Sequence, residues 1–194
     1  MRFEIIKKED FVVHSWSGGT TAEIFLYPPS SHWEKKDFQI RVSSADCRID
    51  GAPYSDFTGY TRHICPLRGT MQMVHEGHHE IKLNPYEVDI FDGAWLTYHT
   101  GIAIDFNLLH TNRWNGSMMA VESGKSLCMP EFGLIGFFAV TDTDVFFEQE
   151  NVLLKEGDFV IFHDVPPSTE FRLTAQNAIT CVMAVFAFPK ESQK

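Results

Sequence analysis

Short segments in which apolar and polar residues alternate follow one another along nearly the whole chain, and this pattern restricts the fold more than any other feature. Residues 38–43 place Phe38, Ile40 and Val42 on one face and polar side chains on the other, which is the period of a half-buried β-strand. Residues 101–109 alternate in the same way. Turns rich in glycine, proline and asparagine separate such segments, and no helical period runs longer than about two turns. The sequence therefore predicts an all-β protein of the sandwich or barrel type, with little helix.

A turn followed by a strand occurs twice, roughly seventy residues apart, and indicates an internal repeat. The two copies are LNPYEVDIFD at residues 83–92 and LKEGDFVIFHD at residues 154–164, with one insertion allowed. The turn Glu156-Gly157-Asp158 of the second copy is common in cupin barrels. The repeat predicts a duplicated small barrel; the more specific bicupin, in which one chain holds two cupin-like β-barrels or sandwiches, is what the family resemblance described below implies. We expect a motif-bearing N-terminal part at residues 1–110 and a C-terminal cupin-like part at residues 111–194 of a single bicupin unit, 1–194.

The net charge narrows the class of partner. The chain has 16 lysine and arginine residues against 26 aspartate and glutamate residues, a formal net charge of −10. Nucleic acids and anionic membrane surfaces both need clustered basic residues, so neither is expected as a partner. A small anionic metabolite stays compatible with this charge because a pocket can be locally positive. A homodimer is left open.

The expected location follows from hydropathy and cysteine usage. No uninterrupted apolar run reaches the length of a membrane span, and residues 1–10 show no signal-peptide core. The cysteines are widely spaced without a CxxC pair, which predicts reduced thiols and a cytoplasmic protein. They are Cys47, Cys65, Cys128 and Cys181.

Two segments concentrate residues that can bind a ligand. Residues 38–67 carry Arg41 and Arg62 on either side of a loop rich in glycine, proline and hydroxyl groups, and loops on a rigid scaffold often bind ligands. Residues 16–24 carry a double glycine, a tryptophan and two threonines. The ordinary alternative is a solvated strand face and a hairpin turn, and residue types alone favour it because most arginines lie in water. Residues 32–36 are polar and are expected to be exposed.

Several short motifs in a fixed order resemble those of the HutD/Ves family. They lie within residues 16–107, whereas residues 111–194 resemble only generic cupin-like sequence. One departure is Ile40, which stands where the family usually has a tryptophan before the arginine of its second motif. The motifs are WSGGTTAEI (16–24), FQIRVSSA (38–45), GAPYSDFTGYTR (51–62), LRG (67–69), FDG (91–93) and DFN (105–107).

The resemblance implies a cytoplasmic bicupin associated with histidine utilisation, where members are proposed to bind a small pathway metabolite and to restrain flux. The resemblance does not imply an established catalytic activity. We therefore predict a non-catalytic protein that binds a small carboxylate such as formylglutamate or urocanate, with glutamate and histidine as further candidates. Two alternatives stay open. One is a cupin enzyme of the isomerase, hydrolase or dioxygenase type acting on a small organic acid, and the other is a protein-interaction module with a vestigial pocket.

The nine histidines do not complete the metal-binding pattern of a cupin, so no metal or other cofactor is expected and folding should need none. His75 fits the first position of that pattern, but Gly77 occupies the next histidine position. In the second half, Ser168 belongs to the segment 166–168, which replaces the proline–glycine–histidine step of the cupin pattern. Neighbouring His78 and His79 on a strand would point to opposite faces, so they would not chelate one ion. Adventitious metal binding by a histidine cluster is left open.

No catalytic residue is predicted, because the chain lacks a GxSxG motif and nothing marks a cysteine as reactive. We expect the N-terminal motifs to converge on one pocket, in which Arg62, with Arg41 as second choice, holds the carboxylate through its planar fork of donors. An apolar cavity with few placed polar groups is the usual form of such a site. The other predicted residues are Ser43, Thr20, Thr21 and Asn107 as neutral partners, Trp16 and Phe106 as walls, and Glu23 and Asp105 as ion-pair partners.

Overall fold

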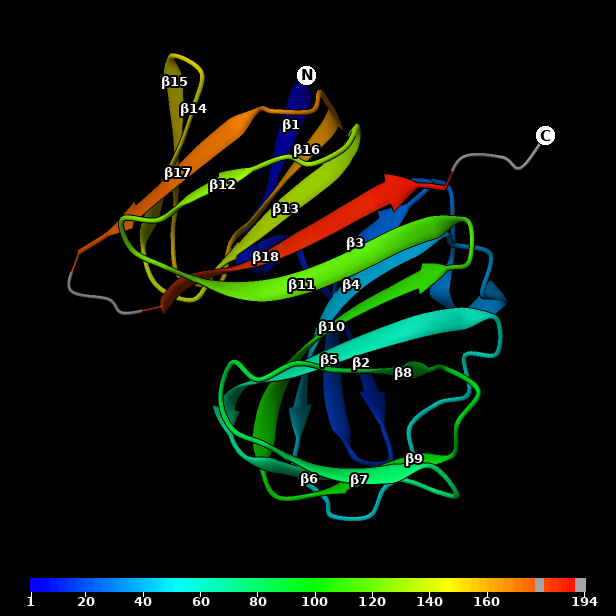
Figure 1. Cartoon of the computed structure of the whole chain (residues 1–194). Coiled ribbons are helices and arrows are strands. Elements are labelled where there is room, and N and C mark those ends of the chain that lie inside the picture. The colour runs from blue at the N-terminus through cyan, green and yellow to red at the C-terminus, as the bar shows by residue number, and fades with distance from the viewer. Residues whose placement is uncertain (177–179, 191–194) are drawn as a thin grey trace. The chain divides into compact units, whose positions relative to one another are not determined.

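The computed structural model describes residues 1–176 and 180–190, and it confirms the all-β prediction (Figure 1). Within these ranges the chain forms strands joined by turns, together with two short 3-10 helices, η1 (Lys8–Asp10) and η2 (Trp33–Lys35). No helix among the described residues is long and apolar enough to cross a membrane.

The chain divides into two compact units. The first comprises Phe11–Trp114 and is called the 11–114 unit; the second combines Met1–Asp10 with Asn115–Lys194 and is called the 115–194 unit. The sequence analysis grouped residues 1–10 with the N-terminal part. In the structure β1 (Arg2–Ile6) instead pairs antiparallel with β16 (Phe159–Val165), a long-range pairing that no local pattern reveals.

The 11–114 unit contains two antiparallel sheets. The larger has six strands in the order β2-β3-β4-β10-β5-β8, and the smaller has three in the order β7-β6-β9 (Figure 1). Together with the two sheets of the other unit, residues 1–176 and 180–190 form four sheets. The strands are β2 (Val12–Trp16), β3 (Gly19–Tyr27), β4 (Ile40–Cys47), β5 (Tyr60–Gly69), β6 (Met71–His75), β7 (His79–Leu83), β8 (Asp89–Asp92), β9 (Thr97–Thr100) and β10 (Ala103–Thr111).

Strand β4 shows why the six-stranded sheet can carry a site. The sequence analysis predicted a half-buried strand for this segment, with a solvated polar face as the ordinary alternative to a ligand site. Ile40 and Val42 are buried as predicted, but Arg41 and Ser43 on the polar face are buried as well. The polar face of the strand is therefore enclosed by other parts of the unit and does not face bulk water.

Two apolar clusters hold the 11–114 unit together. One is formed around Met71 and Met73 of β6 and Phe91 of β8, and the other packs Phe38 against Phe57 and Tyr60. Burial of such side chains contributes about 1.5–3 kcal/mol each and offsets the cost of ordering the chain.

The 115–194 unit also contains two sheets, of five strands in the order β1-β16-β13-β18-β11 and of four in the order β12-β17-β14-β15. Its core is rich in phenylalanine: Phe162 lies 4.7 Å from Phe147 and 4.9 Å from Phe171 between ring centroids. The remaining strands are β11 (Trp114–Glu122), β12 (Ser126–Cys128), β13 (Gly133–Ala139), β14 (Thr143–Phe147), β15 (Glu150–Leu154), β17 (Glu170–Ala175) and β18 (Thr180–Pro189).

Candidate functional site

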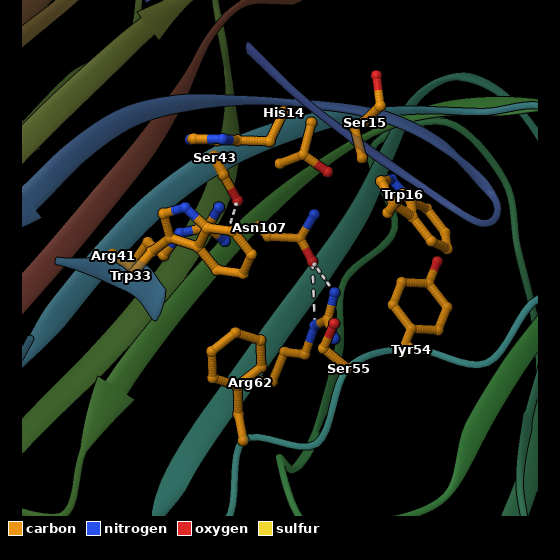
Figure 2. A pocket seen from close by; sticks show the side chains of 13 residues that line it. His14, Ser15, Trp16, Trp33, Arg41, Ser43, Tyr54, Ser55, Arg62 and Asn107 are labelled. Carbon is orange, nitrogen blue, oxygen red and sulfur yellow. Dashed lines mark hydrogen bonds between the residues drawn. The ribbon is translucent and has the colours of Figure 1, made fainter. Parts of the chain in front are cut away.

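A cavity of about 80 Å³ lies in the 11–114 unit, and strands β2, β3, β4, β5 and β10 contribute to its lining (Figure 2). Strand register explains how distant residues meet there. Leu109 of β10 pairs with Arg41 of β4 on one side and with Arg62 of β5 on the other, and Asn107 pairs with Ser43. Directly paired residues of antiparallel strands point to the same face, so both arginines reach the same side of the sheet. The lining residues are His14, Ser15, Trp16, Thr21, Trp33, Arg41, Ser43, Ala45, Tyr54, Ser55, Phe57, Arg62 and Asn107.

Arg62 is a buried cation without an ion-pair partner among the described residues. Its Nε and Nη2 donate to Asn107 Oδ1 at 3.1 and 3.0 Å, as the dashed lines in Figure 2 show. The guanidinium lies 4.3 Å from the ring centroid of Tyr54, a cation–π contact. Burial lowers the pKa of Arg62, yet a guanidinium stays protonated in proteins. The cavity therefore contains a positive charge that neutral groups solvate.

Asp105 orients this arrangement from beneath the cavity. It is fully buried and accepts hydrogen bonds from the backbone N–H of Ala45 at 3.2 Å, the thiol of Cys47 at 3.3 Å and the hydroxyl of Tyr54 at 3.4 Å. It also accepts a hydrogen bond from Asn107 Nδ2, which directs the amide oxygen of Asn107 toward Arg62. Burial raises the pKa of Asp105, and the charge of Arg62 opposes that rise.

Arg41 differs from Arg62 because its charge is balanced. Its Nε lies 3.4 Å from Glu23 Oε2, and its Nη1 donates to Ser43 Oγ at 3.0 Å. Burial lowers the pKa of Arg41, and the carboxylate of Glu23 partly offsets this. Arg41 thus adds hydrogen-bond donors to the cavity with less net charge than Arg62 does.

Aromatic side chains form the walls, and three of the lining residues carry ring nitrogens without a protein partner. Trp16 Nε1, Trp33 Nε1 and His14 Nε2 are buried and make no hydrogen bond within the protein. The tryptophan N–H groups can only donate. Buried polar atoms normally have partners, so these groups indicate a place for acceptor atoms from outside the chain.

Six of the ten predicted site residues line the cavity: Trp16, Thr21, Arg41, Ser43, Arg62 and Asn107. Glu23 and Asp105 lie behind the lining and hold Arg41 and Asn107, respectively.

Thr20 and Phe106 do not line the cavity. Successive residues of a strand point to opposite faces, so when Thr21 and Asn107 face the cavity, their neighbours Thr20 and Phe106 face away. Thr20 is exposed and Phe106 is fully buried on the other side of β10. The alternation was visible in the sequence and would have excluded one residue of each adjacent pair.

The sequence analysis missed the second tryptophan of the cavity and most of its loop residues. Trp33 lies in the segment 32–36 that was expected to be exposed, and in the structure it is half-buried and lines the cavity. A tryptophan within a polar segment was a signal for a buried contact. The other missed residues are His14, Ser15, Ala45, Tyr54, Ser55 and Phe57.

The lining suits an organic anion better than a metal ion. Of the thirteen lining residues one is a histidine, and none is cysteine, aspartate or glutamate, the residue types that bind transition metals. Gly77, at the second histidine position of the cupin pattern, lies in a turn with φ of 77°.

Comparison with known proteins identifies relatives over almost the whole chain. The HutD family model matches residues 8–183. A conserved protein of unknown function from Pseudomonas aeruginosa has 24% sequence identity and a TM-score of 0.85, covering 96% of this chain and 99% of that one. HutD from Pseudomonas fluorescens has 22% identity and a TM-score of 0.80, covering 97% of this chain and 100% of that one.

A more distant structure shows the fold class. A cupin 2 conserved barrel domain protein from Leptotrichia buccalis has 9% identity and a TM-score of 0.55, covering 95% of this chain and 96% of that one. The fold is therefore cupin-like. No curated protein sequence matches the chain.

Proposed function

Because this chain belongs to the HutD family, we propose that it is a metabolite-binding protein that holds a small carboxylate in the cavity of the 11–114 unit. We also propose the bicupin description, in which the two sheets of each unit form one cupin-like barrel or sandwich. A cytoplasmic location and a restraining role in histidine utilisation complete the proposal. These two parts rest on family membership.

The observation that supports it most strongly is that the buried Arg62 has no direct ion-pair partner among the described residues. Glu23 balances Arg41, but among the described residues no carboxylate lies within ion-pair distance of Arg62. Burying a charge without a direct partner is costly, and a ligand anion would reduce that cost beyond what Asp105 provides from behind Asn107. A hydrogen bond to a charged group contributes about 1.5–3 kcal/mol, which is enough to select an anion over a neutral ligand.

A planar carboxylate matches the remaining donors of the cavity. Two of the N–H donors of Arg62 are bonded to Asn107, and a guanidinium has five. Two parallel N–H bonds from a guanidinium fit the two oxygens of a carboxylate. The unpaired indole N–H groups of Trp16 and Trp33 favour a ligand with a further acceptor, as formylglutamate has.

Binding without catalysis fits the residues that line the cavity. They include no cysteine and no carboxylate, and their serine hydroxyls have no neighbouring histidine–carboxylate pair among the described contacts. Nucleophilic catalysis needs such an activated group. No specific contact favours an enzyme of the isomerase, hydrolase or dioxygenase type, or an interaction module with a vestigial pocket.

Calorimetric titration with formylglutamate, urocanate, glutamate and histidine tests the proposal. We expect at least one to bind the wild type, with Arg62→Ala weakening binding by about tenfold or more. Arg62→Lys should also weaken binding, because an ammonium keeps the charge but loses the bidentate fork. Arg113→Ala removes an exposed arginine of the same unit and should leave binding unchanged. Equal affinity in all four proteins would exclude Arg62 from the site, and failure of all four compounds to bind would refute the carboxylate.

A further inference from the structure

A second cluster of polar side chains in the 11–114 unit shares no residue with the cavity. It consists of His75, His79 and Asp89, whose ligand atoms all lie within 4.8 Å of one another. His75 is the last residue of β6 and His79 the first of β7, and the two are directly paired across the hairpin. Paired residues point to the same face, which places the imidazole centroids 4.5 Å apart.

Asp89, the first residue of β8, offers one carboxylate oxygen to each histidine. Its Oδ2 lies 2.8 Å from His75 Nε2, and its Oδ1 lies 3.4 Å from His79 Nε2. Three donor atoms from three strands thus converge on one point. A strand pair and a neighbouring strand form a more rigid support for such a cluster than a loop does.

The other nitrogen of His75 is held as in metal-binding histidines. Thr97 Oγ1 lies 3.1 Å from the backbone carbonyl of Trp95 and 2.9 Å from His75 Nδ1, so a hydroxyl that donates to Trp95 can accept from His75 Nδ1–H. In that tautomer Nε2 of His75 is the atom that would ligate a cation, and Asp89 Oδ2, 2.8 Å away, would supply the second ligand. A hydrogen bond from the second ring nitrogen to a fixed oxygen is typical of histidines that ligate metals.

Burial and access also fit an ion. The His75 side chain is fully buried and that of Asp89 is 8% exposed, whereas that of His79 is 39% exposed, which leaves an entry on the His79 side. Phe91 and Trp95 form an apolar wall, with centroids 4.3 and 5.8 Å from His75. An apolar shell of this kind strengthens the binding of an ion by excluding water from the ligands.

We propose that His75, His79 and Asp89 form a binding site for a divalent first-row transition metal ion, with Zn²⁺ as the simplest occupant. Two imidazoles and one carboxylate suit such ions better than Mg²⁺ or Ca²⁺, which prefer oxygen ligands. Zinc bonds of about 2.1 Å imply a separation of about 3.4 Å between tetrahedral ligands. His79 and Asp89 already have this separation, and the shorter His75–Asp89 distance would widen on binding. Water would complete the coordination on the exposed side.

The sequence analysis expected no metal because the cupin histidine pattern is broken at Gly77 and Ser168 and because neighbouring His78 and His79 would point to opposite faces. In the structure His78 instead stacks on Trp95 at 3.7 Å between centroids, and His75 is the partner of His79. This site uses different residues from the carboxylate cavity, so either proposal can fail without the other.

Calorimetric titration of the full, untagged chain with Zn²⁺ alone, after treatment with a chelator, tests the site. We expect one Zn²⁺ per chain, with His79→Gln and Asp89→Asn each weakening binding by at least about tenfold. His78→Gln removes the neighbouring histidine and should change the affinity by less than about twofold. Absence of stoichiometric binding would overturn the site, and so would equal binding by wild type and His79→Gln, because the metal would then be an adventitious ion only.

A second measurement covers the case in which a variant does not fold. Wild-type crystals grown with Zn²⁺ should show an anomalous diffraction peak between His75 Nε2, His79 Nε2 and Asp89. A peak elsewhere, or none, would refute the site. Thermal melting of the metal-free variants shows separately whether they retain the fold.

Discussion

At the scale of single residues, Asp105 connects the fold to the cavity. It holds the amide of Asn107, which in turn holds the guanidinium of Arg62. Every group that hydrogen-bonds to Asp105 is a donor, from Ala45, Cys47, Tyr54 and Asn107. A carboxylate suits this position because it accepts only.

Asp105→Asn should therefore affect both stability and binding. The new amide N–H₂ would face other donors and leave them unsatisfied, which costs about 1–3 kcal/mol in the free energy of unfolding. Binding of the carboxylate should weaken because Asn107 loses its orientation. Urea unfolding and calorimetry measure the two effects. Asp46→Asn, which removes only a solvent-exposed ion pair with Arg48, should change stability by less than about 1 kcal/mol and binding not at all. Wild-type behaviour of Asp105→Asn would contradict the positioning role.

His63 should make stability fall in mild acid. Its Nε2 lies 3.2 Å from His110 Nε2, and burial, reinforced by His110, lowers the pKa of His63 from 6.5 to about 4. Between these values the unfolded chain binds a proton that the folded chain excludes, so acidification favours unfolding. The loss attributable to His63 between pH 6.5 and pH 4 should be at most roughly 3 kcal/mol.

Urea unfolding of wild type and His63→Gln at several pH values between 7 and 4 measures this loss. Glutamine keeps a donor for His110 but does not titrate, so the decline of stability with acidification should become shallower. His75 and His99 have lowered pKa values for the same reason, burial, and should leave a residual decline. His32→Gln, at an exposed histidine, should keep the wild-type slope. An unchanged slope in His63→Gln would contradict the assignment.

At the scale of elements, the junction of β2 and β3 places Trp16 and Thr21 beside the arginines. Gly19 begins β3 and packs against β4, where a Cβ atom would lie 1.9 Å from the carbonyl oxygen of Asp46. A glycine is required here because the two backbones approach closely. The double glycine in the sequence was compatible with such an approach, but it did not identify the neighbouring strand.

Gly19→Ala should separate β3 from β4 at this point and displace the cavity wall. We expect a loss of about 1–3 kcal/mol in unfolding free energy and weaker ligand binding. Gly124→Ala is the matched control, because Gly124 has a positive φ of 85° but open space around the added methyl, and it lies in the 115–194 unit. It should lose stability without losing affinity. Retained affinity in Gly19→Ala would show that the wall does not contact the ligand.

At the scale of the whole molecule, two units with separate cores lie in one chain. The cavity is lined by residues of the 11–114 unit, whereas a phenylalanine-rich core cluster lies in the 115–194 unit. Stability and ligand binding should therefore respond to different substitutions.

Phe171→Leu tests this separation. Phe171 is fully buried and contacts Phe137 and Phe162, so the smaller side chain should cost about 1–3 kcal/mol. Calorimetry well below the melting temperature should give wild-type affinity for the carboxylate. A large loss of affinity in folded Phe171→Leu would show that the two units are coupled.

The sequence by itself determined the features that depend on local chemistry. Alternation and turn residues predicted an all-β chain, and ordered motifs predicted the HutD family; the structure and the family match confirm both. The same motifs contained Arg41, Arg62, Ser43 and Asn107, which the structure brings to one cavity. Such features can be predicted because strand period and turn preference arise from neighbouring residues.

Only the tertiary structure decided which polar residues are buried and which meet. The pairing of β1 with β16 depends on strand register across a long sequence separation. The entry of Trp33 into the cavity and the approach of Asp89 to the hairpin residues His75 and His79 depend on packing between elements. A one-residue change of register would turn every side chain of a strand to the other face. Register is set by the packing of the whole core, so Arg62, which resembles a solvated residue in the sequence, becomes a buried cation hydrogen-bonded to Asn107 only in the fold.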